Sequence, residues 1–206
     1  MLATDERFKN IYQDQPGLII GRGDNENYQP NPLFETFKGI KIGCNTAYSI
    51  TKLDYLIWMD PPFFVEHCHE IKQLDCLKFA VNPHTYPHHD IDIYELRVSG
   101  IEGCSESFNK GFYPCELSGY LALNISLIMG LNPIWVHGFT SDMKDQYGTI
   151  RSDKFNYLFE WAKKNNRKIY LTQEQSYLRK FFDYSPLPEI KNKKLKVKND
   201  DLPILV

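Results

Sequence analysis

The sequence predicts an α/β fold built on one mostly parallel sheet that helices flank on both faces. Short continuous apolar runs recur along the chain, and stretches with helical spacing separate several of them. Strands that are buried on both faces have this continuous apolar character, whereas strands with one wet face alternate apolar and polar residues. The chain has 206 residues, of which 42% are hydrophobic, so one domain with a sizeable core is the default expectation.

The first half of the chain carries the clearest strand signals. The expected strands are 17–20, 40–43, 55–59 and 77–81. Residues 63–74 place apolar side chains at helical spacing, which predicts a helix between the third and fourth strands. A strand, a helix and a further strand in this order are typical of a parallel pair with a crossover.

The second half repeats these signals. Residues 117–129 are apolar nearly all round a helix, which predicts a helix buried on every side. Strands are expected at 134–136 and at 168–171. Between these two strands, Ser152 is a good N-cap for a further helix. After the second strand, residues 176–182 are expected to form a closing helix.

The predicted domain spans residues 1–186 and contains one region with weak signals. This region, 82–114, is rich in Pro, His, Gly and Tyr, with a single strand candidate at 91–98. We expect it to be an irregular insertion that borders the ligand site. Residues 187–206 are a lysine-rich tail, for which a solvated extension is favoured over a contact with phosphate or membrane.

Composition narrows the classes of function. Lys and Arg number 24 against 26 Asp and Glu, and a formal net charge of −2 makes a nucleic-acid partner unexpected. No apolar run approaches the length of a membrane span, and the N-terminal residues lack the order of a secretory signal. The five cysteines are an odd number without CxxC spacing, which favours a reduced, cytoplasmic protein.

Small or polar residues follow the apolar strands directly. Gly21 and Gly23 follow the first strand, Asn45 the second and Asp60 the third, while a polar loop, 137–142, follows the strand at 134–136. The carboxyl ends of parallel strands lie at one edge of a sheet, and ligands bind at that edge. We therefore expect these residues to converge around a ligand.

The chemistry of these residues suits a nucleotide or a phosphate. Glycines let a backbone approach a ligand closely, and an Asn side chain offers both a donor and an acceptor. Ser118-Gly119 opens the long helix, where backbone N–H groups without partners can meet an anion. Other interpretations stay open: ordinary turns for the glycines, an Asx turn for Asn45, and a helix N-cap for Asp60, which is favoured there over a metal ligand.

Two common phosphate-binding motifs are absent from the sequence. Gly21-Arg22-Gly23 does not continue into GxGxxG because Glu26 occupies the position of the last glycine. The chain also contains no GKS or GKT triplet. A dinucleotide fingerprint and a P-loop are therefore both disfavoured.

The order of the remaining motifs resembles that of the bacterial lipooligosaccharide sialyltransferases. A glycine loop follows the first strand, and an Asn follows the second. Ser118-Gly119-x-x-Ala122 precedes a strand that ends in Gly138-x-x-x-Asp142. The resemblance in layout covers about residues 17–185 and extends to other Rossmann-like proteins, namely 6-hydroxymethylpterin diphosphokinase-like and flagellin-glycosylation proteins.

This resemblance implies a CMP-sugar donor and a transfer by direct inverting displacement. Gly21 and Gly23 would face the CMP part of the donor, and Asn45 would contact the nucleotide or the sugar. Ser118 and Gly119 would lie near the donor phosphate and sugar. In that family a His is the general base, tyrosines near the phosphate aid departure of the nucleotide, and no metal is needed.

The chain departs from the family at two places. Its glycine loop continues with Asp24-Asn25-Glu26 where the family has Pro-Ser-Leu, and the stretch 143–154 has no His where the family keeps its base. Catalytic candidates are therefore drawn from the residues that could border the site. They are His88, His89, Asp145 and Tyr147.

These candidates differ in what they could do. His88 and His89 belong to a histidine-rich run in which prolines prevent a helical metal site, but an imidazole can accept or donate a proton near neutral pH. Tyr147 could donate a hydrogen bond to a phosphate oxygen. Gly138 and Arg151 complete the set of donor-binding candidates, since a guanidinium fork suits phosphate.

The favoured function is transfer of a sugar from a nucleotide sugar, preferably a CMP-sugar, to an acceptor that the sequence leaves open. This function requires no cofactor, and no metal ligand is assigned. One alternative is a Mg²⁺-dependent diphosphotransferase of the pterin kinase-like type, with Asp60 as the Mg²⁺ ligand. The other is a non-catalytic protein that binds or sequesters a nucleotide, which the missing base favours. The assembly state is open, a homo-oligomer included.

Overall fold

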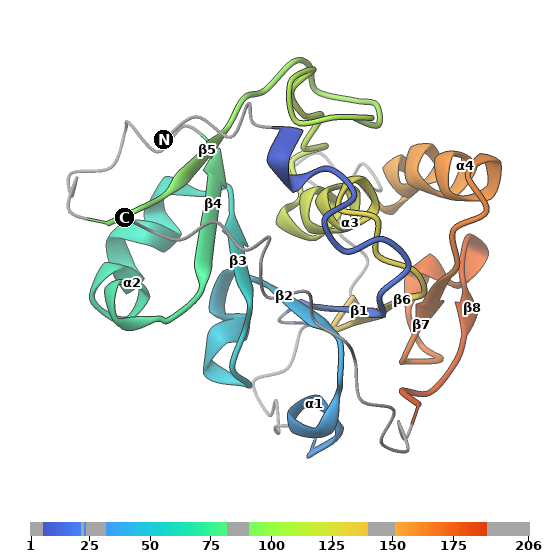
Figure 1. Cartoon of the computed structure of the whole chain (residues 1–206), viewed down its shortest axis with the longest axis horizontal. Helices are drawn as coiled ribbons and strands as arrows, with labels where there is room; N and C mark the ends of the chain where they lie inside the picture. Colours follow the sequence, from blue (N-terminus) through green and yellow to red (C-terminus); the bar gives the residue numbers. More distant parts are fainter. Residues whose placement is uncertain (1–5, 22, 24–31, 82–90, 140–150, 189–206) are drawn as a thin grey trace.

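A computed structural model describes most of the chain (Figure 1). The described residues are 6–21, 23, 32–81, 91–139 and 151–188. The strands are β1 (Gly17–Ile20), β2 (Ile40–Cys44), β3 (Tyr55–Trp58), β4 (Leu77–Val81), β5 (Tyr94–Leu96), β6 (Ile134–His137), β7 (Ile169–Leu171) and β8 (Asp183–Tyr184). The α-helices are α1 (Pro32–Thr36), α2 (Pro61–Gln73), α3 (Ser118–Ile128) and α4 (Asn156–Lys164). The 3-10 helices are η1 (Glu6–Phe8), η2 (Asn45–Ser49), η4 (Arg151–Phe155) and η5 (Tyr177–Lys180).

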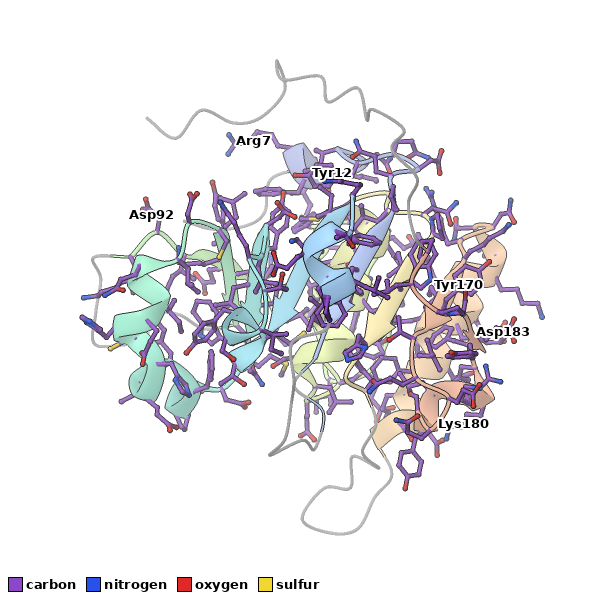
Figure 2. The ribbon with its side chains drawn as sticks, turned by 90° about the horizontal axis from the view of Figure 1, so that it is seen from below. Arg7, Tyr12, Asp92, Tyr170, Lys180 and Asp183 are labelled. Carbon is purple, nitrogen blue, oxygen red and sulfur yellow. The ribbon has the colours of Figure 1, made fainter. Side chains whose placement is uncertain are left out.

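In this described part, eight strands form one sheet in the order β5-β4-β3-β2-β1-β6-β7-β8. Every pairing between neighbouring strands is parallel. Figure 2 shows the two edges of the sheet: Asp92, just before β5, lies at one side, and Tyr170 and Asp183 lie at the other. The predicted α/β class with a parallel sheet and flanking helices is confirmed.

Each face of the sheet has its own core. Alternate residues of a strand point to opposite faces, so Ile19 packs on the side of α3 and α4 while Leu18 packs on the side of α1 and α2. Phe34 of α1 and Phe64 of α2 fill the second core. Figure 1 shows α3 and α4 on one side of the sheet and α1 on the other. This double burial explains why β1 and β3 are apolar without alternation.

The helix that the sequence predicts to be buried on every side is α3. All of its residues are buried, and it packs against β1, β2 and β3. Such a helix cannot have a polar face toward water, which is why its apolar residues show no helical stripe. None of the described helices combines the length and the apolar character that a membrane-spanning helix needs.

The start of α4 differs from the prediction. Ser152 does not cap this helix, because the turn η4 precedes it and places Ser152 inside the helical segment. The buried Ser152 hydroxyl has no hydrogen-bond partner within the described ranges. The capping prediction at this position was therefore wrong.

The C-terminal part of the domain contains less helix than expected and one additional strand. In place of a helix over 176–182, the short helix η5 leads into β8. Ser176 caps η5, since its hydroxyl accepts a hydrogen bond from the amide of Leu178 at 3.3 Å. Leu187, which the sequence assigns to the tail, is buried in the core beneath α1 and α2.

The region after β4 contains one short strand, β5, within the expected strand 91–98, and a bridge joins Val98 to Phe112. Residues 82–90 lie outside the described part of the chain, as do residues 189–206 of the tail. The placement of the insertion at the border of a ligand site therefore stays a prediction.

Candidate functional site

A cleft of about 220 Å³ lies at the carboxyl edge of the sheet. Residues that follow β1, β2, β3 and β6 line it together with the start of α3. They are Gly21, Gly23, Cys44, Asn45, Asp60, Glu116, Leu117, Ser118, Gly119, Gly138 and Phe139. The structure thus brings together seven residues that the sequence singles out as donor-binding candidates: Gly21, Gly23, Asn45, Asp60, Ser118, Gly119 and Gly138.

The strand register explains this convergence. Ile20, the last residue of β1, pairs with Gly43 of β2 and with His137 of β6. Cys44, the last residue of β2, pairs with Ile57 of β3. The four strands therefore end at nearly the same level, and the residues that follow them meet above the sheet edge.

Two larger hollows lie elsewhere among the residues that the structure describes. One, of about 340 Å³, lies between α4 and the strands β7 and β8, and another, of about 270 Å³, lies where the chain enters β3 and β4. Volume alone would favour these hollows. The cleft at the carboxyl edge is the better candidate because open α/β sheets bind ligands there.

The glycines of the cleft have a structural explanation. Gly138 has φ +78°, and a Cβ there would lie 2.1 Å from the carbonyl oxygen of Gly21. A Cβ on Gly119 would lie 2.1 Å from the ring of Phe139. Packing among β1, β6 and α3 thus requires glycine at positions 119 and 138, whether or not a ligand approaches the backbone.

Asn45 presents an unsatisfied polar atom. Its backbone has φ +50°, a left-handed conformation that Asn adopts more readily than most residues. Its side-chain oxygen, Oδ1, is buried and has no hydrogen-bond partner among the residues described. A buried acceptor without a donor is costly, so this atom is suited to a ligand N–H or O–H group.

The amino end of α3 supplies free donors to the cleft. The first i to i−4 hydrogen bond of this helix runs from the amide of Leu121 to the carbonyl of Leu117 at 3.1 Å. The amides of Ser118, Gly119 and Tyr120 therefore have no partner within the helix, and Leu117 provides no side-chain cap. These amides and the positive end of the helix dipole favour an anion at this end.

Asp60 stands at the N-cap position of α2, as the sequence indicates, but its carboxylate makes no capping hydrogen bond. The reason lies in the next two residues. Pro61 and Pro62 have no N–H, so the first turn of α2 offers few donors to a cap. The Asp60 side chain is exposed at the rim of the cleft.

The titratable side chains in the described lining are Cys44, Asp60 and Glu116. Burial raises the pKa of the Cys44 thiol to about 12, so this thiol stays protonated near neutral pH. No Lys or Arg side chain belongs to the lining that the structure describes. The donors that this part of the cleft offers to a phosphate are therefore backbone amides and the neutral side chains of Ser118 and Asn45.

His137 ends β6 close to the cleft but does not line it. Its Nδ1 lies 2.7 Å from the hydroxyl of Thr172, and its ring packs edge-on against Phe34 at 4.8 Å. Burial lowers the pKa of His137 to about 4, so its imidazole is neutral near pH 7. Its described contacts are those of a packed structural histidine.

The remaining candidates cannot be placed. His88, His89, Asp145 and Tyr147 lie outside the described residues, and so does the side chain of Arg151, whose backbone begins η4. Their roles stay predictions. Within the described ranges, no group of three or more His, Cys, Asp or Glu side chains is arranged to hold a metal ion, so those residues offer Mg²⁺ no complete protein ligand set around Asp60.

The sequence did not identify Cys44, Glu116, Leu117 and Phe139 as cleft residues. A signal was present for Cys44, Leu117 and Phe139, which are chain neighbours of Asn45, Ser118 and Gly138, whereas Glu116 lies two residues before Ser118. Glu116 has φ +57°, and this left-handed turn brings the chain into α3 beside the cleft. Such a conformation cannot be read from a Glu in the sequence.

Comparison with solved structures relates this fold to known proteins. The MAf glycosyltransferase from Magnetospirillum magneticum AMB-1 matches with a TM-score of 0.59 and 9% identity, over 94% of this chain and 38% of its own. The sialyltransferase CstII from Campylobacter jejuni in complex with CMP-3FNeuAc matches with a TM-score of 0.51 and 14% identity, over 83% of this chain and 85% of its own. The chain has a glycosyltransferase-like fold.

A third structure agrees with these two. Sialyltransferase CST-II in complex with a trisaccharide acceptor and CMP matches with a TM-score of 0.50 and 15% identity, over 84% of this chain and 86% of its own. The resemblance to sialyltransferases is thus confirmed for the fold, whereas its pterin diphosphokinase-like part has no support among these structures. No family model matches the sequence, and no curated protein matches it either.

Proposed function

We propose that this protein is a glycosyltransferase that binds a nucleotide-activated sugar in the cleft at the carboxyl edge of its sheet. The observation that carries the proposal is the position of the cleft in a glycosyltransferase-like fold: it lies between the amino end of α3 and the orphan oxygen of Asn45. One side of the cleft offers donors to an anion, and the other offers a buried acceptor. A nucleotide needs both.

The phosphate of the donor would bind at the amino end of α3. The free amides of Ser118 and Gly119 can donate to phosphate oxygens, and the positive end of the helix dipole adds a favourable field. The same donors would meet the charge that grows on the phosphate as the nucleotide leaves. Because the phosphate carries more negative charge in the transition state, these donors stabilise the transition state more than the ground state. They are already in place, so no rearrangement is needed.

The base or the sugar would satisfy Asn45. The buried Oδ1 can accept from the exocyclic amine of cytosine, from the ring N–H of uracil or from a sugar hydroxyl. CMP is favoured because the similar CstII structures contain CMP or a CMP-sugar analogue. The amide group of Asn45 could also donate, so the side chain alone does not fix the choice of base.

A binding and turnover screen tests the proposal. The purified chain is titrated with CMP, UMP and ATP by calorimetry, and release of free nucleotide from CMP- and UDP-sugars is followed with and without Mg²⁺. We expect CMP to bind more tightly than ATP and CMP-sugars to be hydrolysed slowly in the absence of an acceptor.

The other outcomes separate the alternatives. Saturable nucleotide binding without turnover of any donor would favour a non-catalytic nucleotide-binding protein. Strictly Mg²⁺-dependent consumption of ATP would favour a diphosphotransferase. The absence of any nucleotide binding would remove the proposed function together with its pocket.

A further inference from the structure

We infer that Asp60 is the proton acceptor of the cleft, that is, the general base that activates the sugar acceptor. The inference rests on the proposed transfer function and names a residue for its missing chemical role. It concerns the carboxylate that follows β3 and lines the cleft together with the amino end of α3. Three observations about the described residues support it.

The first observation is that the Asp60 carboxylate is not used by the fold. An Asp at an N-cap normally accepts a hydrogen bond from the second or third amide of the helix. Here Pro61 and Pro62 occupy the first two positions, and the Asp60 side chain makes no capping bond. Within the described ranges, the structure gives this carboxylate no hydrogen bond or ion pair, so it is available to a ligand.

The second observation concerns the other titratable groups that line the cleft. The Cys44 thiol is 4% exposed and stays protonated, so it cannot accept a proton near neutral pH. Glu116 already interacts with another group and stands next to the first turn of α3, where the proposed phosphate would lie. Asp60 is the described carboxylate of the lining that is both exposed and unengaged.

The third observation is that Asp60 and the amino end of α3 line the same small cleft. Gly119 at the amino end of α3 packs against Phe139, which follows β6, while α3 as a whole packs against β1, β2 and β3. Asp60 follows β3, and β2 and β1 lie between β3 and β6. Because the whole cleft has only about 220 Å³, a carboxylate in its lining lies close to any acceptor hydroxyl that attacks a sugar bound beside the phosphate site.

The transfer step balances with Asp60 in this role. The acceptor hydroxyl oxygen forms a bond to the anomeric carbon of the sugar, while the bond from that carbon to the nucleotide phosphate oxygen breaks. The electron pair of the broken bond leaves with the phosphate, which gains one negative charge. The proton of the hydroxyl passes to Asp60, which loses one negative charge. Water in place of the acceptor gives hydrolysis of the donor by the same step.

Substitution of Asp60 in the full chain tests the role, with hydrolysis of CMP-N-acetylneuraminate and UDP-N-acetylglucosamine as the assay. For Asp60→Asn we expect kcat to fall by about 100- to 1,000-fold, the usual contribution of a general base, with the Kd for CMP nearly unchanged. Formate added to Asp60→Ala should restore part of the rate, because a small carboxylate can occupy the vacated place. Asp75→Asn is the matched control, since Asp75 is 96% exposed and precedes β4 at the opposite edge of the sheet.

Three results would overturn the inference, and they are distinguishable. If Asp60→Asn turns over donor as fast as the unsubstituted protein, Asp60 is not the base, although the transfer function stands. If the lost rate of Asp60→Asn returns when Mg²⁺ is raised, Asp60 is a metal ligand. If the unsubstituted protein turns over no donor, the transfer function and the role of Asp60 both fail. Equal melting temperatures of the variants exclude misfolding as the cause of a lost rate.

Discussion

The side-chain oxygen of Asn45 is the residue-scale feature on which the proposed pocket depends most. It combines a buried, unsatisfied acceptor with a left-handed backbone that suits Asn. The backbone alone would be explained by a turn, as the Asx interpretation has it. An Asx turn does not explain the oxygen without a partner, because in such a turn the side-chain oxygen accepts a hydrogen bond from a backbone amide. A ligand donor accounts for both features.

Replacing Asn45 should therefore weaken nucleotide binding without unfolding the protein. Asn45→Gly removes the amide and keeps the left-handed backbone accessible, so we expect the Kd for CMP to rise about 10- to 100-fold, in line with the cost of one lost buried hydrogen bond. Calorimetric titration measures the change. Asn156→Ala, at an exposed position of α4, is the control and should leave the Kd unaltered. An unchanged Kd for Asn45→Gly would remove Asn45 from the pocket.

His137 makes a second residue-scale prediction, which concerns stability and pH. Its folded-state pKa of about 4 lies below the value of 6.5 expected for an exposed His, because burial disfavours the charged ring. Between these two values the unfolded chain binds more protons than the folded one, so stability falls as the pH drops from 6.5 towards 4. From the shift, His137 contributes about 3 kcal/mol to this loss.

Urea denaturation at pH 7, 5 and 4 measures this contribution. Carboxylates also titrate in this range, so the readout is the difference between the unsubstituted protein and His137→Gln, which keeps a polar group near Thr172 and has no titrating ring. We expect the pH dependence of the free energy of unfolding to be shallower in the variant. Parallel pH dependences would show that His137 is not held neutral by the fold.

At the scale of elements, α3 organises the site and depends on one buried side chain. Asn124, which is 1% exposed, accepts a hydrogen bond from the amide of Ser105 at 2.9 Å and donates one to its carbonyl at 2.9 Å. The Ser105 hydroxyl lies within hydrogen-bonding distance of the carbonyls of Ser107 and Gly111. This network fastens the segment after β5 to α3, and that segment leads directly into the residues at the amino end of the helix.

Asn124→Ala should destabilise the protein by about 2–4 kcal/mol, because two buried backbone groups of Ser105 lose their partners. Chemical denaturation measures the change. Ser126→Ala is the control on the same helix: its hydroxyl bonds back to the carbonyl of Ala122 at 2.7 Å, a local contact whose loss should cost less than about 1 kcal/mol. A similar small loss for both variants would mean that the segment after β5 does not depend on Asn124.

At the scale of the whole molecule, most of the sheet was predictable, whereas β8 and the short connections were not. Continuous apolar runs such as 17–20 and 134–136 mark strands buried on both faces, and each run became a strand. The helix α1 and the turn η2 left no such signal, since they are a single turn or little more. The prediction that Ser152 caps α4 was wrong because a Ser side chain caps a helix only from the N-cap position, whereas Ser152 lies within η4.

The cleft followed from topology, whereas its chemistry did not. Parallel strands that end at one level bring together the residues after them, so the convergence of Gly21, Asn45 and Asp60 could be foreseen. The Asn45 oxygen is buried by residues that are distant in the sequence. The capping bond at Asp60 is missing because the two prolines that follow have no amide N–H. The burial of the Asn45 oxygen appears only once the chain is folded, whereas Pro61 and Pro62, directly after Asp60, were already visible in the sequence.

The central claim is that the cleft at the carboxyl edge binds a nucleotide, and chemical-shift mapping of the labelled protein with CMP tests it most directly. We predict that the amide signals of Asn45, Ser118 and Gly119 shift with a common saturation curve. Signals around the larger hollow between α4 and the strands β7 and β8 should stay in place. Shifts confined to that hollow, or no saturable shifts at all, would contradict the claim.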